Sequence, residues 1–385
     1  MKKEPFLYLS AFILDGCFAL TGLCVPLLAM RLGATYDDLG ALGATGALIY
    51  SLSCLVSGRL SDRVGYRRSL TVASLMVVII FSCYPFVTRV AHIFILSGAT
   101  GLVISNFWPP LQAWLGKGKN RRSLLRALGG FNVAWSLGFL VGPALGGQIY
   151  EANPNQVFFL GAGLVAVLFL ALLFLNVRES QPVATAAATV QSFPTSRLFL
   201  PVAWVANFAT FFSIGTVRSL FPKLATDLGI QPGTLGHLMA LIGLAQLAAF
   251  FLISRTDRWQ FRLSPLVMVQ LLAMAGLFAF VFGATPGVFV LGLLSQGALA
   301  GVTFTASIFY SLYAEGAGGR RTGFHESIVG SGFLIGPLAG GFAAEHLGPR
   351  SPYLLAAVAI LCAIAFQTYL LNKKSARELR SQAAR

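Results

Sequence analysis

Long apolar stretches alternate with short polar segments along the whole chain. Each apolar stretch holds roughly 20 residues, the length that an α-helix needs to cross the hydrocarbon core of a bilayer. The pattern predicts twelve such helices and an all-α membrane protein. The expected helices begin near Phe6, Leu39, Ser69, Ala91, Leu124 and Asn155 in the first half, and near Phe199, Thr234, Ser264, Gly287, Gly323 and Ser351 in the second half.

One segment interrupts this pattern. Residues 177–198 are rich in Ala, Thr, Pro and Ser and have no apolar stripe, which indicates a flexible linker. We therefore divide the chain into an N-terminal six-helix bundle at 1–176, the linker, a C-terminal six-helix bundle at 199–372 and a basic tail at 373–385. Little chain is left for a separate soluble domain.

A pattern of glycines and one proline occurs twice, and its copies differ by 194 in residue number (129 and 323 at the start, 147 and 341 at the end). This spacing indicates a duplicated unit. Glycines three and four residues apart leave a smooth face for close helix packing, and a proline inside a helix bends it. Two duplicated membrane bundles with a site between them are typical of secondary transporters. The first copy is Gly129, Gly138, Gly142, Pro143, Gly146 and Gly147, and the second is Gly323, Gly332, Gly336, Pro337, Gly340 and Gly341.

The composition excludes a soluble protein, because 56% of the 385 residues are hydrophobic and only 11% are charged. The net charge of +15 reflects topology and contact with anionic lipid, and it does not indicate a nucleic-acid partner. With a cytoplasmic N-terminus, 23 of the 28 Lys and Arg fall on the cytoplasmic side, as the positive-inside rule requires. We expect a multi-pass protein of the bacterial inner (plasma) membrane, with both termini, the linker and the tail in the cytoplasm. The remaining basic residues are Arg31, Arg89, Arg218, Lys223 and Arg350.

The cysteines and histidines show no spacing typical of metal ligands. There is no C-x-x-C pair, and the four histidines are scattered. We expect the cysteines to be small buried apolar residues, and we predict no metal ion and no cofactor. Nor does the sequence contain an HExxH motif or a nucleophile elbow, so we do not expect an enzyme. The cysteines are Cys17, Cys24, Cys54, Cys83 and Cys362.

The loop after the second predicted helix closely resembles the signature G-x-x-x-D-[RK]-x-G-x-[RK]-[RK] of the major facilitator superfamily. The resemblance implies two pseudo-symmetric six-helix bundles, and a latch in which Asp62 meets the eleventh helix and closes the cytoplasmic side in the outward-facing state. The alternative is a solvated loop whose arginines only set topology. The matching residues are Gly58, Asp62, Arg63, Gly65, Arg67 and Arg68, and a degenerate copy in the second half has Asp257, Arg258 and Arg262.

The repeated glycine pattern resembles a motif found in the fifth helix of exporters of this superfamily, chiefly drug–proton antiporters. This resemblance favours export over import. The alternative is that the glycines serve packing alone, because the eleventh predicted helix has the same pattern as the fifth.

Two acids lie within the predicted helices, where charge is costly and usually functional. Asp15 lies midway along the first helix and is our candidate for a carboxylate that carries a proton or pairs with a cation. The alternative is a neutral acid that is hydrogen-bonded between helices. Glu326 lies one turn inside the eleventh helix and either shares this role or belongs to the latch.

Arg218 is the one base that we place within a span, in the outer part of the seventh helix. Aligning the two halves sets Arg218 opposite Gly22, so one half has a cation where the other has no side chain. Arg218 either binds an anionic group of a substrate, pairs with an acid, or extends to the lipid headgroups.

Polar and aromatic residues within the predicted helices are candidates to line a central cavity. One sequence does not define the rotation of each helix, so every member of this set also has an ordinary packing interpretation. The candidates are Asn106, Trp108, Gln112, Asn132, Trp135, Asn207, Gln246 and Tyr310.

These features together favour a secondary active transporter that moves a small amphipathic organic molecule by alternating access. A proton-coupled exporter that works as a monomer, driven by the proton gradient, is our main hypothesis. One departure from the family weighs against coupling by its usual route: the fourth predicted helix has no Lys or Arg. The alternatives are a facilitator or importer of an organic anion held by Arg218, and a membrane sensor or scaffold that transports nothing.

Overall fold

The computed structural model describes residues 3–117, 119, 121–174, 196–313 and 319–383. These residues form thirteen α-helices and one short 3₁₀ helix, and no strand occurs among them. The helices of the first half are α1 (Lys3–Arg31), α2 (Tyr36–Val64), α3 (Tyr66–Cys83), η1 (Tyr84–Phe86), α4 (Val90–Ile104), α5 (Trp108–Gly116), α6 (Arg121–Ala152) and α7 (Pro154–Phe174). Those of the second half are α8 (Ser196–Asp227), α9 (Pro232–Ile253), α10 (Ser264–Phe282), α11 (Pro286–Tyr313), α12 (Gly319–Leu347) and α13 (Ser351–Ala383).

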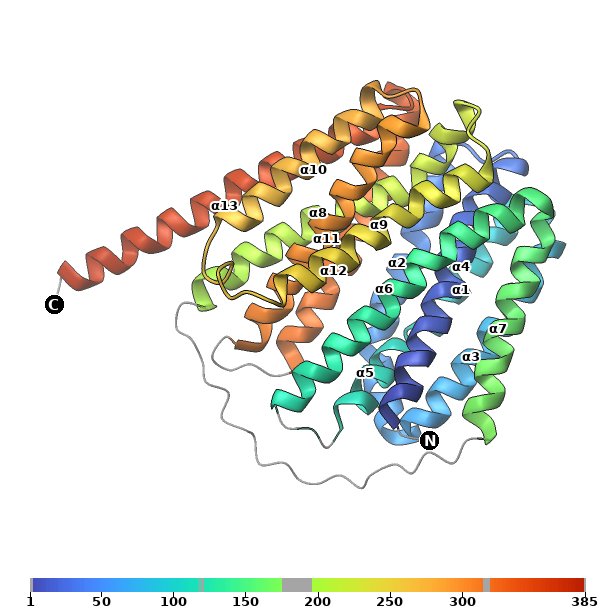
Figure 1. Ribbon diagram of the computed structural model, residues 1–385, viewed down its shortest axis with the longest axis horizontal. Helices are drawn as coiled ribbons and strands as arrows, with labels where there is room; N and C mark the ends of the chain where they lie inside the picture. The colour runs from blue at the N-terminus through green and yellow to red at the C-terminus, as the bar shows by residue number, and fades with distance from the viewer. Residues whose placement is uncertain (1–2, 118, 120, 175–195, 314–318, 384–385) are drawn as a thin grey trace.

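The helices form two bundles, one of α1 to α7 and one of α8 to α13 (Figure 1). The two bundles meet chiefly along two helix pairs, α2 with α12 and α6 with α9. Most of the predicted linker lies outside the described residues. Within the predicted basic tail, α13 continues without a break to Ala383 and projects beyond the bundle (Figure 1). Lys, Ala, Arg, Glu and Leu, which have high helix propensity, make up most of this extension.

Eleven segments of the described chain are long and apolar enough to cross a membrane. They comprise every long helix except α2, and the segment Val90–Gly116 joins α4 and α5. The remaining helix, α2, has 29 residues and packs against α4 and α12 within the same assembly. Many large apolar side chains are exposed on the outer surface, as a lipid-facing belt requires; Phe86, Phe174 and Phe282 are among them. The chain therefore forms a multi-pass membrane protein.

One half contains a helix break that the other half lacks. The predicted fourth span divides into α4 and α5, whereas α11 is continuous. Pro110 has no N–H to donate to the carbonyl of Asn106, four residues earlier. The Ser69 hydroxyl of α3 donates to this carbonyl at 2.8 Å. The break therefore leaves no unpaired carbonyl at this position.

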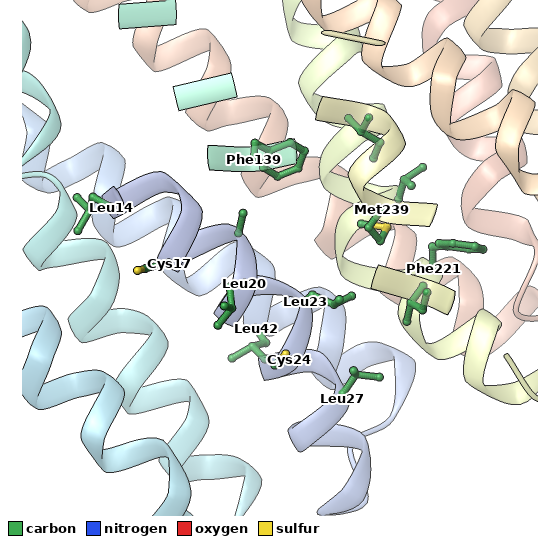
Figure 2. Close-up of a cluster of buried hydrophobic side chains, with 14 of the residues drawn as sticks. Leu14, Cys17, Leu20, Leu23, Cys24, Leu27, Leu42, Phe139, Phe221 and Met239 are labelled. Atoms are coloured by element: carbon green, nitrogen blue, oxygen red, sulfur yellow. The ribbon is translucent and has the colours of Figure 1, made fainter. Parts of the chain in front are cut away.

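Buried apolar side chains fill both bundles and the contact between them (Figure 2). Figure 2 shows the face of α1 that is formed by Leu14, Cys17, Leu20, Cys24 and neighbouring leucines. The expectation that the cysteines are buried is correct for these two and wrong for Cys83 and Cys362, which are exposed on the bundle surface. In a membrane protein the outer helix faces are as apolar as the inner ones, so sequence alone does not distinguish them.

The repeated glycines pack as predicted, with one exception. A Cβ atom at Gly146 would lie 2.8 Å from the Leu20 carbonyl oxygen of α1, and one at Gly332 would lie 2.8 Å from the Phe212 nitrogen of α8. The stripe therefore joins α6 to α1 and α12 to α8 in the same way. Gly129 is the exception, because nothing lies within 4 Å of a Cβ atom built there. The surroundings of Gly323 lie outside the described part of the chain.

Candidate functional site

A cavity of about 480 Å³ lies between the two bundles. Its wall is mainly aromatic and aliphatic, with residues from both halves. The aromatic lining residues are Phe18, Tyr50, Phe81, Tyr84, Trp108, Phe131, Trp135, Phe139, Phe211, Phe304 and Phe333. The candidate residues that line this cavity are Asp15, Trp108, Gln112, Trp135, Arg218, Gln246 and Glu326.

Four candidate residues do not line this cavity. Asn106 lies at the break between α4 and α5, and Asn132 accepts a hydrogen bond from the Trp135 indole at 3.2 Å. Asn207 is fully buried within the C-terminal bundle. Tyr310 is also buried there, and its hydroxyl accepts a hydrogen bond from the Phe261 backbone N–H at 2.7 Å. Whether each of these side chains faces the cavity depends on the rotation of its helix about its own axis. A polar residue in the sequence is compatible with any rotation, so the sequence alone did not separate these four from the lining residues.

Arg218 lies inside the cavity and does not extend to the bundle surface. Its guanidinium carbon is 4.5 Å from the ring centroid of Phe139 and 5.8 Å from that of Phe333. A Cβ atom at Gly22 would lie 3.8 Å from Arg218 Nη2, so the absent side chain at Gly22 leaves room for this cation. Arg218 and Gly22, which the alignment of the two halves sets opposite each other, thus also lie close together in the structure.

Asp15 lies on α1 and lines the same cavity as this cation. Its Oδ2 atom is buried and has no hydrogen-bond partner among the described residues. Asp15 and Arg218 attract each other electrostatically, although no ion pair within 4.0 Å joins them in the described chain. The carboxylate therefore faces the cavity with one oxygen available to a ligand or a proton.

Glu326 forms a second acidic position in the cavity wall, on α12. Tyr50 and Cys54 of α2 lie near Glu326, which interacts electrostatically with both. The neighbouring His325 was not a candidate from the sequence. It is buried, and its Nδ1 lies 2.7 Å from the Ser307 hydroxyl. Neither periodicity nor spacing distinguishes this histidine from an ordinary core residue.

The two ends of the assembly differ in how the halves meet. The linker end is where α1 begins, α7 ends and α8 begins; the far end is where α1 ends and α2 begins (Figure 1). At the far end, a Cβ atom at Gly147 would lie 2.9 Å from the Gly236 Cα atom, and one at Gly341 would lie 2.9 Å from the Gly40 Cα atom. Backbones from opposite halves are thus in direct contact at this end.

The latch motif lies at the linker end, where its residues bond within their own half. Asp62 is exposed and accepts a hydrogen bond from the Tyr66 hydroxyl at 3.0 Å. Arg67 donates to the carbonyls of Leu172 and Leu173 at 2.8 Å each, at the end of α7. Because Asp62 bonds within its own half, the predicted contact with the eleventh helix stays a prediction for another conformation. Arg63 and Arg68 are exposed, and the surroundings of Gly58 lie outside the described residues.

The turn between α2 and α3 explains one glycine of this motif. Gly65 has a φ of 96°, which residues with a Cβ atom rarely adopt. In the degenerate copy, Phe261 adopts a φ of 54°, and its N–H bonds to Tyr310. Asp257 accepts a hydrogen bond from Gln260 at 2.8 Å, and Arg258 and Arg262 are exposed. The second copy therefore also has a residue with a positive φ, but within a longer connection, residues 254–263 between α9 and α10.

Comparisons with known proteins agree with this architecture. The family model described as Major Facilitator Superfamily matches residues 7–204 and again residues 203–385. The multidrug resistance protein MdtG of Dickeya zeae (strain Ech586) is 25% identical, with 96% of this chain and 95% of that protein covered. MdtG of Klebsiella pneumoniae (strain 342) is 24% identical, with 96% and 93% covered.

Solved structures share the fold at low identity. A bacterial homologue of the human lysosomal transporter Spinster, in an inward-facing and unoccupied conformation, has a TM-score of 0.73 at 15% identity, with 96% of each chain covered. The nucleoside transporter NupG has a TM-score of 0.68 at 15% identity, with 96% of this chain and 100% of that chain covered. Because these structures are of different transporters, the likeness supports the fold and not a cargo.

Proposed function

This chain belongs to the major facilitator superfamily of membrane transporters, and from that premise we propose that it exports a small amphipathic organic molecule in exchange for protons. The family is one of transporters and not a class of enzymes. We place the protein in the bacterial inner membrane, with the linker end and both termini in the cytoplasm. It works as a monomer, without a cofactor, and its halves rock about the central cavity.

The observation that carries this proposal is the cavity itself. Its aromatic wall suits the apolar part of an amphipathic molecule. Its charged lining residues, among those described, are Asp15, Glu326 and Arg218. Two acids and one base favour a cationic or neutral substrate over an anion. The MdtG relatives, which are named as multidrug resistance proteins, support export as the direction.

Asp15 has the central role in this proposal. When the cavity faces outward, Asp15 takes a proton from outside, which removes its charge and weakens its hold on a cationic substrate. When the cavity faces inward, the proton leaves to the cytoplasm and the next substrate binds. Coupling then arises because one carboxylate serves proton and substrate at different stages. The open Oδ2 atom of Asp15 supports this role.

The second candidate function is a facilitator or importer for an organic anion. It is favoured by one observation: Arg218 lies inside the cavity between Phe139 and Phe333, where a planar anion would stack and pair with the guanidinium. In that case Asp15 has a structural role. The fourth predicted helix, without Lys or Arg, is compatible with this function because no coupling arginine is needed.

A thermal-shift comparison separates the two functions. The purified protein in detergent is heated with a lipophilic cation, tetraphenylphosphonium, or with a lipophilic anion, tetraphenylborate. A ligand at about 100 times its Kd stabilises the folded state by about 2.7 kcal/mol. We expect the cation to raise the Tm of wild-type protein and not that of Asp15→Asn. Asp37→Asn, outside the cavity, is the matched control and retains the shift.

The opposite pattern would contradict export of cations. If only the anion stabilises the protein, and this depends on Arg218 but not on Asp15, the anion facilitator is the correct function. Arg255→Gln is the matched control for Arg218→Gln, because Arg255 is exposed at the end of α9 and away from the cavity.

A further inference from the structure

The duplication extends beyond the glycine pattern to an acidic residue. Glu151 follows Gly147 by four positions, and Glu345 follows Gly341 by four positions. The two glutamates therefore have the same separation of 194 residues (151 and 345) as the glycines. Both lie near the ends of their helices, α6 and α12, at the far end of the assembly.

Each glutamate bonds to the first turn of a helix in the opposite half. Glu151 Oε2 of α6 accepts a hydrogen bond from the Gly233 N–H of α9 at 2.7 Å. Glu345 Oε2 of α12 accepts one from the Tyr36 N–H of α2 at 3.0 Å. The first N–H groups of a helix have no partner within it and have partial positive charge, so a carboxylate is a favourable acceptor.

These bonds occur beside the places where the backbones of the two halves touch. Gly147 meets Gly236 one turn from the Glu151 contact, and Gly341 meets Gly40 one turn from the Glu345 contact. A side chain at any of these glycines would force the helices apart. The close approach therefore brings each carboxylate within reach of the opposite helix end, and separation of the halves would break both bonds.

Further polar contacts surround each bond, and they differ between the two sites. Beside Glu345, the Tyr36 hydroxyl donates to Asp227 at 2.9 Å, and Lys223 lies 3.6 Å from the same carboxylate. Beside Glu151, His237 lies 3.3 Å from Gln148. The two carboxylate-to-helix bonds are the shared element.

We propose that Glu151 and Glu345 form a paired far-end latch that closes this end of the transporter and opens in each transport cycle. They are positioning residues, because they do not line the cavity and act through the relative placement of the halves. The far-end latch is closed in this structure, while Asp62 at the linker end bonds within its own half. This inference requires only alternating access, and not the substrate or the proton coupling proposed above.

The test measures distances at both ends, by double electron–electron resonance between spin labels on the detergent-purified full chain without substrate. Cys54, Cys83 and Cys362 are first replaced by serine, and the buried cysteines are kept. One label pair reports the far end (Asn155→Cys with Thr285→Cys), and another reports the linker end (Arg126→Cys with Ser254→Cys). All four labelled positions are exposed.

In the double variant Glu151→Ala with Glu345→Ala, we expect more molecules to have a long distance at the far end. We expect more molecules to have a short distance at the linker end. Each single variant shifts the ratio of the two populations about two- to fivefold, the range for an exposed charge at a helix end. The double variant shifts it by the product of the two. Glu151→Gln with Glu345→Gln keeps one acceptor oxygen in each side chain and loses the charge, so it gives a smaller shift. The glutamine double variant also tests the inference if the alanine double variant does not fold.

The matched control is Asp38→Ala. Asp38 accepts from the Thr35 N–H at 2.9 Å in a capping box, so it stabilises the first turn of α2 without joining the halves. If the glutamates are ordinary helix caps, this control shifts the distances as much as they do, and the inference is wrong. It is equally wrong if both glutamate pairs keep the wild-type distances at both ends. Neither result depends on which substrate is transported.

Discussion

The two halves of this transporter have the same packing residues but different charged residues in the cavity. Gly138, Gly142 and Gly146 meet α1 in one half, and Gly332, Gly336 and Gly340 meet α8 in the other. The cavity charges do not repeat in this way. Arg218 is paired with Gly22, and the equivalent of Asp15 under the same alignment is Phe211, which also lines the cavity. The repeat therefore builds a symmetric scaffold around an asymmetric site.

The aromatic neighbours of Arg218 show how the two features combine. Phe139 and Phe333 are separated by the 194 residues of the repeat, and both rings lie beside the single guanidinium. A symmetric pair of rings thus holds one cation that only the second half supplies. The repeated phenylalanines thus define where the charge lies, and Arg218, which has no counterpart in the first half, supplies the charge.

The largest expected effect comes from breaking the scaffold in either half. Gly142→Leu and Gly336→Leu each place a side chain against the backbone of the partner helix, where a Cβ atom alone would be 2.9 Å from Leu20 N or 2.9 Å from Phe212 Cα. We expect a loss of about 3 kcal/mol or more in stability for each variant. Fluorescence-detected size-exclusion chromatography of detergent extracts measures this as loss of the monodisperse peak.

Gly129→Leu is the control for this prediction, because a Cβ atom there meets nothing within 4 Å. It should keep the wild-type peak. Equal tolerance of leucine at Gly142 and Gly129 would show that the stripe is not a packing face.

The next effect concerns the charge that only the first half has. Asp15→Asn removes the carboxylate but keeps its size, and we expect at least about a tenfold loss of transport driven by a pH gradient, as for a lost hydrogen bond to a charged group. Transport of a fluorescent lipophilic cation into inverted membrane vesicles measures this. Asp37→Asn retains full activity. Undiminished pH-driven transport by Asp15→Asn would remove Asp15 from the coupling mechanism.

Arg218→Gln tests the charge that only the second half has. Without this cation the remaining lining charges are acidic, so we expect a lipophilic cation to bind about tenfold more tightly and an anion to lose affinity. Isothermal titration calorimetry with both ligands measures the change. A loss of cation affinity would instead mean that Arg218 acts mainly by orienting Asp15.

The smallest effect concerns the helix break in the first half. Ser69→Ala leaves the Asn106 carbonyl without its side-chain donor, at a cost of about 1 kcal/mol. We expect a Tm that is a few degrees lower. Thr71→Ala, whose hydroxyl bonds only to the Arg67 carbonyl of its own helix, is the control and should change the Tm less. Equal Tm values for the two variants would mean that the Ser69 bond does not support the break.

The helices and the duplication were predictable from the chain because both depend on local or repeated features. An apolar run of bilayer length forms a helix wherever it packs, and identical spacing reports a common unit. The sequence also marked Asp15 and Arg218 as unusual, since charge within a span is costly, but it left the side chain of Arg218 free to reach a substrate, an acid or the lipid headgroups. The break at Asn106 was not predicted, although Pro109 and Pro110 were the available signal.

The remaining placements depend on helix rotation. Gln246 lines the cavity while Asn207 is buried within its bundle, and both are polar residues within apolar helices. Glu151 and Glu345 fall within the repeat, but their bonds cross between halves and only the assembled structure pairs them.

The sequence by itself determined the membrane class, the twelve-helix duplicated plan, the repeated glycine pattern and the presence of two acids and one base within spans. These follow from hydropathy, spacing and the cost of charge in lipid, which need no knowledge of neighbours. The tertiary structure decided which polar residues face the cavity, where Arg218 stacks, and which end is closed. Those outcomes are set by contacts between helices distant in sequence, whose rotations and separations no local pattern specifies.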